Sequence, residues 1–151
     1  MFSNVLVVCV GNICRSPMAV ALLRHRLTDP DVRVQSAGIA ALSGSAMDPL
    51  AKAVLQSHQV PTRRHEARQV NRHLLLQADL ILLMEQAHVP RILKLAPEVR
   101  GRTFLLGKWQ HTLEIADPYR RPKSAFEQTY QHLSRCIDDW LPHLQSGEQD
   151  K

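Results

Sequence analysis

The chain has 151 residues, of which 44% are hydrophobic and 22% are charged, and its formal net charge is +5. This length and apolar content predict one globular domain over residues 1–151 that folds without disulfides or a bound metal, and they exclude disordered, collagen-like and coiled-coil chains. The sequence has neither the ~20 consecutive apolar residues of a membrane span nor the basic N-terminal segment of a signal peptide. Its three cysteines do not make a disulfide framework, so we expect a cytoplasmic protein with no membrane insertion.

Arginine dominates the positive charge, supplying 14 of the 19 basic residues. The planar guanidinium fork suits carboxylate and phosphate groups, which favours an anionic partner. A solvated basic surface, or weak non-specific affinity for nucleic acid, explains the same count. Charge alone does not decide between these interpretations.

Four short apolar runs predict β-strands over residues 4–10, 32–37, 79–84 and 102–106. They alternate with segments that carry helix-start signals. This alternation predicts an α/β fold with a central four-stranded, mostly parallel sheet and helices on both faces. In such sheets a ligand binds beyond the carboxyl ends of the strands, so the loop after the first strand is the candidate site.

Capping residues mark the helix starts. The Ser-Pro pair at 16–17 and the Asp-Pro pair at 48–49 each combine an N-cap with proline at the first helical position, which predicts helices ending near residues 27 and 59. Asn71 is predicted to cap a short helix over residues 73–77, and residues 86–95 predict another.

Ser124 and Glu127 have the spacing of a capping box, which predicts the start of the last helix. Apolar side chains recur along it at steps of three or four residues and indicate core packing. They are Phe126, Tyr130, Leu133, Ile137, Leu141 and Leu144. Cys136 lies beside this stripe and is predicted to be a buried hydrophobic residue, and residues 146–151 are predicted to be a frayed tail.

The loop after the first strand carries the chemistry. Cys9 ends the strand, and Arg15 stands at the mouth of the next helix. Five residues lie between them, enough to curl into a ring whose N–H groups point inward as an anion nest: Val10, Gly11, Asn12, Ile13 and Cys14. Gly11 can adopt the positive φ of such a curl, and Asn12 tolerates it. The helix dipole, the Arg15 fork and a hydrogen bond from Ser16 favour a thiolate at Cys9.

This loop resembles the signature loop of the low-molecular-weight protein tyrosine phosphatases and lies at the family's usual place near the N-terminus. Three further segments agree in order: Ser-Ala-Gly at 36–38, His-Glu-Ala-Arg-Gln at 65–69, and Asp-Pro-Tyr at 117–119. The similarity covers about residues 3–145. The chain's opening and the run Asp-Pro-Tyr-Arg at 117–120 look most like bacterial members paired with tyrosine kinases of exopolysaccharide export.

The resemblance implies a phosphotyrosine protein phosphatase that needs no metal or other cofactor. Cys9 is then the nucleophile that forms a cysteinyl-phosphate, and Arg15 binds the phosphate. The expelled phenolate needs a proton, and Asp117 resembles the family's general acid, which later activates water. Ser36 and His65 resemble, with Asn12, the network that holds the loop in its curl. Without the resemblance, His65 would be interpreted as a surface histidine and Asp117 as a turn residue.

Leu42, Tyr119 and Arg120 resemble the positions that wall the opening of the site. Many eukaryotic members carry bulky aromatic residues where Leu42 and Arg120 stand, so the substrate preference of this chain is expected to differ. Arg120, with Arg121 and Lys123, predicts a basic lip suited to acidic peptides, although these residues also fit a solvated surface. Ile13 favours a flat aromatic ring, since arginine-phosphate-specific relatives carry a smaller polar residue there.

Several alternatives remain open. Cys14 is either a redox partner of Cys9 or a small packing residue. Arsenate reduction on the same loop needs two further cysteines as a relay, and none lies between Cys14 and Cys136. A binding module without turnover is disfavoured because both Cys9 and Asp117 are present. The expected partner is a phosphotyrosine-containing protein, a membrane-anchored bacterial tyrosine kinase, with no nucleic acid; we expect a monomer.

Overall fold

The computed structural model describes residues 2–145. Its sheet has the strand order β2-β1-β3-β4, and every pairing is parallel. The strands are β1 (Asn4–Cys9), β2 (Arg33–Gly38), β3 (Leu80–Leu83) and β4 (Thr103–Leu105). The predicted α/β class and four-stranded parallel sheet are therefore confirmed, with strand boundaries within two residues of those expected. Residues 146–151, predicted to be a frayed tail, lie outside the described residues.

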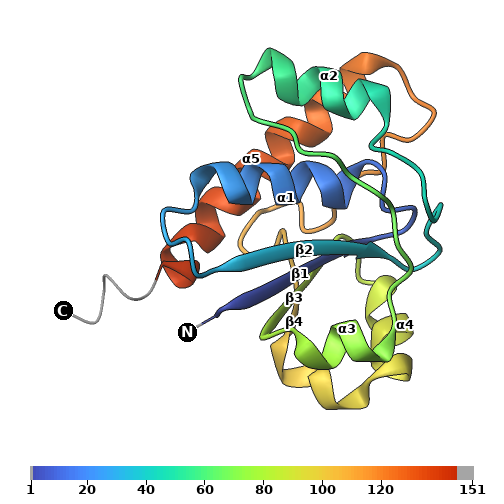
Figure 1. Cartoon of the computed structure of the whole chain (residues 1–151), viewed down its shortest axis with the longest axis vertical. Coiled ribbons are helices and arrows are strands. Elements are labelled where there is room, and N and C mark those ends of the chain that lie inside the picture. Colours follow the sequence, from blue (N-terminus) through green and yellow to red (C-terminus); the bar gives the residue numbers. More distant parts are fainter. Residues whose placement is uncertain (1, 146–151) are drawn as a thin grey trace.

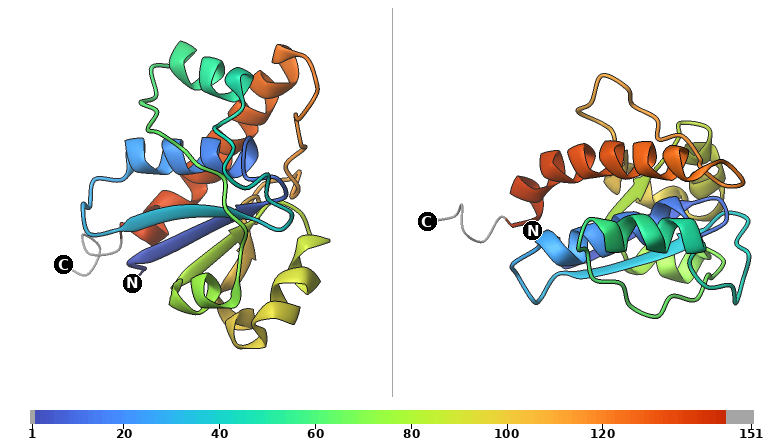
Figure 2. Two further views of the ribbon diagram at one scale, coloured as in Figure 1. Left: turned by 45° about the vertical axis from the view of Figure 1, so that its right-hand side comes forward. Right: turned by 90° about the horizontal axis from the view of Figure 1, so that it is seen from above.

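Helices cover both faces of the sheet, as predicted (Figure 1). One face carries α1 (Arg15–Arg26), α2 (Pro49–Ser57) and α5 (Lys123–Leu144). The other carries α3 (Arg72–Gln77), α4 (His88–Leu95) and a 3₁₀ helix, η1 (Pro97–Arg102), that the sequence did not predict. Two views at right angles to each other show α1 and α5 lying together along the sheet (Figure 2).

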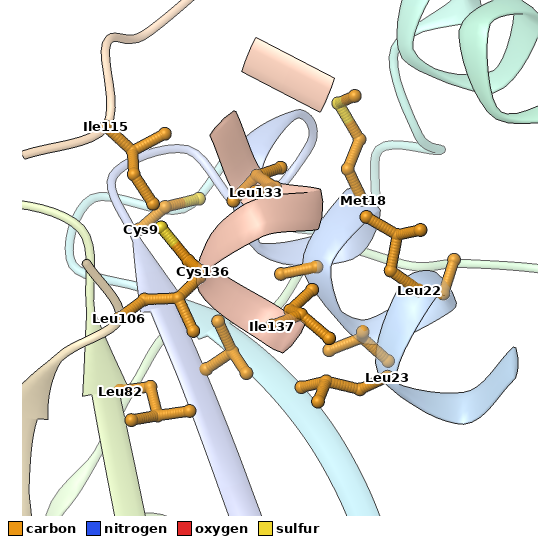
Figure 3. Packing of buried hydrophobic residues seen from close by; sticks show 14 of the residues in the cluster. Cys9, Met18, Leu22, Leu23, Leu82, Leu106, Ile115, Leu133, Cys136 and Ile137 are labelled. Atoms are coloured by element: carbon orange, nitrogen blue, oxygen red, sulfur yellow. The ribbon is translucent and has the colours of Figure 1, made fainter. Parts of the chain in front are cut away.

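Each face of the sheet has its own apolar core because side chains of a strand alternate between the two faces. Val5, Val7 and Cys9 of β1 point into the α1/α5 core, whereas Leu6 and Val8 point into the α3/α4 core. In the first core, leucines of α1 meet Leu133 and Ile137 of α5 (Figure 3). The predicted stripe of α5 is buried except for the half-buried Leu141, and Cys136 is fully buried in it, as predicted.

Two predicted caps are confirmed and two are wrong. The Asp48 carboxylate accepts from the Leu50 N–H at 2.9 Å, and the Asn71 amide oxygen accepts from the Leu74 N–H at 2.9 Å. Helix α1 instead begins at Arg15 with no side-chain cap, since the Ser16 hydroxyl bonds to other side chains.

The predicted capping box of Ser124 and Glu127 is the second wrong cap. Helix α5 begins two residues earlier, with Pro122 at the N-cap position, and has no side-chain cap. The Glu127 carboxylate contacts the His58 ring at 2.8 Å and accepts from Gln131. A tertiary contact with the segment after α2 therefore takes the carboxylate that a capping box would use.

Gly38 ends β2 where this strand passes closest to the turn after β1. A Cβ there would lie 2.4 Å from the Val10 carbonyl oxygen and 3.0 Å from the Asn12 Cβ. The Gly38 N–H and carbonyl are both used, bonding to Arg68 O and Val70 N at 2.9 Å each. The backbone is therefore fixed on both sides, and only glycine fits.

We expect Gly38→Ala to lower the free energy of unfolding by about 2 kcal/mol or more, because the new methyl group meets backbone that is hydrogen-bonded in place. Gly101→Ala is the matched control, since its Cβ would meet no atom within 4 Å. Urea unfolding followed by circular dichroism measures both variants. Equal midpoints for Gly38→Ala and Gly101→Ala would contradict the prediction.

Candidate active site

Residues 9–16 form a tight loop between the carboxyl end of β1 and the start of α1. β1 is an inner strand of the sheet, so the loop lies at the sheet's centre with neighbours on both sides. The carbonyl groups of residues 9–14 all accept hydrogen bonds from outside the ring or from α1. Their donors, in order, are the N–H groups of Ile39, Ala40 and Leu42, the His65 ring, and the N–H groups of Asp48 and Met18, at 2.6–3.0 Å.

This arrangement turns the amide N–H groups of the loop inward. No peptide bond among the described residues is cis, and in a trans peptide the C=O and the following N–H point in opposite directions. Because the carbonyls of residues 9–14 point out to their donors, the N–H groups of residues 10–15 face the centre of the ring. The start of α1 adds the positive end of its dipole. The loop is therefore built to receive an anion.

Asn12 holds the curl. It is completely buried and has a φ of 60°, whereas Gly11 does not have a positive φ. Of the two residues that the sequence offered for the left-handed position, Asn12 takes it, and its side chain compensates for its own strained backbone. Its amide donates to Ser16 Oγ at 2.8 Å and Ser36 Oγ at 2.9 Å, and its oxygen accepts from the Arg68 N–H at 3.0 Å.

Cys9 and Ser16 face each other across the ring, with 2.9 Å between Sγ and Oγ. The Ser16 oxygen already accepts from Asn12, so its own proton is free to be donated to the sulfur. With inward N–H groups around it and Arg15 beyond, the sulfur lies in surroundings that favour negative charge.

Arg15 is a buried arginine, only 1% exposed, and its orientation is fixed from behind. Nη1 donates to Glu85 Oε2 at 2.6 Å and to the Ile115 carbonyl at 2.7 Å, and Nη2 lies 3.6 Å from Asp117 Oδ2. Glu85 lies two residues after the end of β3. The sequence analysis missed it, although its place at the carboxyl end of a strand was a usable signal.

His88, from the first turn of α4, lies behind this ion pair. It is 7% exposed, and its Nε2 lies 3.7 Å from Glu85 Oε2. Burial lowers the pKa of His88. The charge of Arg15 lowers it further, whereas the charge of Glu85 raises it. The neutral ring is therefore favoured beside Arg15.

The mouth of the loop is a pocket of about 140 Å³. Nine of the ten residues that line it belong to the predicted site or its rim: Cys9, Val10, Gly11, Ile13, Cys14, Arg15, Leu42, Asp117 and Tyr119. The tenth is Ala40. Leu42 and Tyr119 are exposed apolar walls, and the Arg120 guanidinium lies 5.2 Å from the centre of the Tyr119 ring. Asp117 Oδ1 accepts from the Tyr119 N–H at 3.1 Å, which orders this wall.

All three cysteines are free and buried. Burial raises the pKa of the Cys14 thiol, and the charges of Asp48 and Asp117 raise it further. Burial and Asp139 raise the pKa of Cys136 to about 12, as expected for a core residue. Because Cys136 lies in the α5 core, it is poorly placed to relay a disulfide outward, as arsenate reduction would need.

Within residues 2–145, no cluster of three or more histidine, cysteine, aspartate or glutamate side chains could hold a metal ion. The same part of the chain contains no helix that is long and apolar enough to cross a membrane.

Comparisons with known proteins identify the family of this chain. Residues 4–150 match the family model described as low molecular weight phosphotyrosine protein phosphatase. The chain is 45% identical over 148 residues to the low molecular weight protein-tyrosine-phosphatase Wzb of Escherichia coli K12, covering 98% of this chain and 99% of that protein.

Two solved structures share the fold at 40% identity and a TM-score of 0.90, covering 95% of this chain and 99% of theirs. One is the tyrosine phosphatase Wzb of Escherichia coli K30 in complex with sulphate, and the other is Vibrio vulnificus Wzb in complex with benzylphosphonate. The chain therefore belongs to the low molecular weight phosphotyrosine protein phosphatase family and is a cysteine-dependent protein-tyrosine-phosphatase.

Proposed function

We propose that this phosphatase hydrolyses phosphotyrosine in a protein through a phosphocysteine at Cys9. The observation that carries the proposal is the row of outward carbonyls over residues 9–14, which turns the following N–H groups toward the Cys9 sulfur. Such a ring binds the equatorial oxygens of a transferring phosphoryl group, where charge gathers in a loose transition state. The loop is held in this shape before any substrate arrives.

In the first step the Cys9 thiolate attacks phosphorus in line with the tyrosine oxygen. The S–P bond forms while the P–O bond to the phenol breaks, and the Asp117 carboxyl donates its proton to the leaving oxygen. Asp117 lies across the pocket mouth, 3.6 Å from Arg15.

In the second step water attacks the phosphocysteine, and ionised Asp117 accepts a proton from that water. The S–P bond breaks, phosphate leaves, and the thiolate regains its hydrogen bond from Ser16. Arg15 supplies the remaining positive charge in both steps. Its contacts with Glu85 and Ile115 use Nη1, which leaves the other side of the guanidinium for two phosphate oxygens.

The walls of the pocket favour an aromatic phosphate ester. Ile13, Leu42 and Tyr119 are apolar or aromatic, and the pocket of about 140 Å³ suits one flat ring. Arg120 lies at the rim over the Tyr119 ring and has a φ of 64°. We infer that this basic rim favours acidic residues around the phosphotyrosine.

We also propose that the physiological substrate is an autophosphorylated, membrane-anchored bacterial tyrosine kinase that controls exopolysaccharide production, and that the phosphatase acts on it as a cytoplasmic monomer. The support is the resemblance of the 117–120 segment and of the chain's opening to phosphatases paired with such kinases. A segment of such a kinase that carries several phosphates would match both the narrow pocket and the basic rim.

We expect Asp117→Asn to lower kcat on phenyl phosphate by on the order of 10²–10⁴-fold, because the phenolate then leaves without a proton. The loss on 4-nitrophenyl phosphate should be smaller, since that leaving group is more acidic. Cys9→Ser should lose turnover on both substrates. Acid quench and intact-mass measurement of the wild-type protein should show one phosphoryl group on Cys9. Full activity of Cys9→Ser, or equal losses of Asp117→Asn on the two esters, would contradict the mechanism.

We expect Glu85→Gln to weaken benzylphosphonate binding and to lower kcat/KM about ten-fold, because Arg15 loses the charged partner that orients it. Glu98→Gln is the matched control: it also breaks an arginine–glutamate pair, with Arg72, but on the exposed surface. Calorimetric titration and steady-state kinetics measure both variants. If Glu98→Gln and Glu85→Gln have the same effect on benzylphosphonate affinity, Glu85 does not position Arg15.

We expect Arg120→Gln to reduce the preference for acidic phosphotyrosine peptides over neutral ones. The ratio of kcat/KM for the two peptides should fall about three-fold, and the difference should shrink at high salt because the rim is exposed. Arg100→Gln, on η1 across the sheet, controls for the change in net charge. An unchanged ratio in Arg120→Gln would mean that the rim does not read the peptide's charge.

A further inference from the structure

A second, larger hollow lies behind the catalytic loop. It has a volume of about 510 Å³ and is formed between α1, the edge strand β2 and the segment of residues 61–68. In two views this segment crosses over α1 and β2 on its way from α2 to α3 (Figures 1 and 2). This hollow, here called the back pocket, shares no lining residue with the catalytic pocket.

The back pocket is lined by an excess of positive charge. Arg24, Arg63, Arg64 and Arg68 all line it, and among the described residues of its wall Glu66 supplies the only carboxylate. None of these four arginines takes part in an ion pair formed among residues 2–145. The guanidiniums are therefore gathered without the carboxylates that would balance them.

Two of these arginines are held in place. The Arg24 Nη2 donates to the Val34 carbonyl at 2.7 Å, and Arg68 donates to the Ser36 carbonyl at 3.0 Å and to Gln35 Oε1 at 2.7 Å. Each of them keeps further N–H groups that these bonds do not use. Burial lowers the pKa of both, and the charge of Arg63 lowers that of Arg24 further. A bound anion would relieve this repulsion.

We propose that the back pocket binds a small anion with linked phosphate groups, a nucleoside triphosphate or an inorganic polyphosphate. A chain of phosphates carries more negative charge and more oxygens than a single phosphate, so it can form bidentate pairs with more of the four guanidinium groups. The volume is that of a small-molecule site. Val20, Met47 and Pro61 give it an apolar wall against which a nucleoside could lie.

The site lies next to the catalytic loop. Ser36 and His65 line the back pocket and bond to Asn12 at 2.9 and 2.6 Å, and Arg68 bonds to Asn12 through its N–H. Asn12 therefore links three residues of the back-pocket wall to the ring around Cys9. An anion that holds Arg68 in place would also hold the residue that fixes the loop's curl.

The experiment uses the full chain with the catalytic pocket saturated by benzylphosphonate, so that the added anion reports on the back pocket. Calorimetric titration with tripolyphosphate, and separately with ATP, is made at constant ionic strength. We expect one binding event, weakened on the order of ten-fold in the double variant Arg24→Gln/Arg63→Gln, with benzylphosphonate affinity unchanged. Tighter binding of ATP assigns the site to a nucleotide, and the reverse order assigns it to polyphosphate.

The matched control is Arg91→Gln/Arg100→Gln, which removes the same charge from the opposite side of the sheet and should bind both anions like the wild type. No binding to the wild type, or equal weakening in both double variants, would overturn the proposal. Equally tight binding of a polyglutamate peptide would also overturn it in favour of an acidic protein partner. Failure of benzylphosphonate to bind would count against the proposed catalytic site and not against the back pocket.

Discussion

The antiparallel directions of C=O and N–H within each trans peptide decide what the loop of residues 9–16 can do. Fixing the carbonyls fixes the amides, so the N–H groups need no acceptor of their own to stay aimed at the centre. The donors that fix the carbonyls come from the turn after β2, the start of α2 and the segment around His65. Residues far apart in the sequence thus preorganise a site that consists mostly of backbone.

A buried guanidinium imposes the second requirement. Arg15 cannot be buried at 1% exposure without partners, since an uncompensated buried charge is costly. Glu85 and the Ile115 carbonyl meet that need from behind, and both lie at the carboxyl edge of the sheet, where loops from different strands converge. The parallel topology therefore brings the nucleophile, Arg15 and Glu85 to one edge, and the long connection between β4 and α5 adds Asp117.

Local signals in the sequence predicted what depends on local physics. The strands, the Asp48 and Asn71 caps and the stripe of α5 follow from periodicity and from side chains that bond within a few residues. Ser16 and Glu127 were wrongly predicted to cap helices because other side chains engage them: Asn12 and Cys9 contact the Ser16 hydroxyl, and His58 contacts the Glu127 carboxylate. The roles of Cys9 and Asp117 came from the resemblance and from the order of motifs.

Glu85 was missed, and the choice between Gly11 and Asn12 for the left-handed residue stayed open, for the same reason. No local pattern tells which of two adjacent residues, Gly11 or Asn12, takes the positive φ, because the answer depends on what the side chain can reach. Asn12 reaches Ser16, Ser36 and the Arg68 backbone, and these bonds offset the strain of its own φ of 60°. Ser36 and Arg68 also line the back pocket. The residues that stabilise the catalytic loop therefore also lie beside the arginines of that pocket. Part of the arginine excess in the composition thus lies behind the catalytic loop, in the back pocket, and Arg15 lies within the loop.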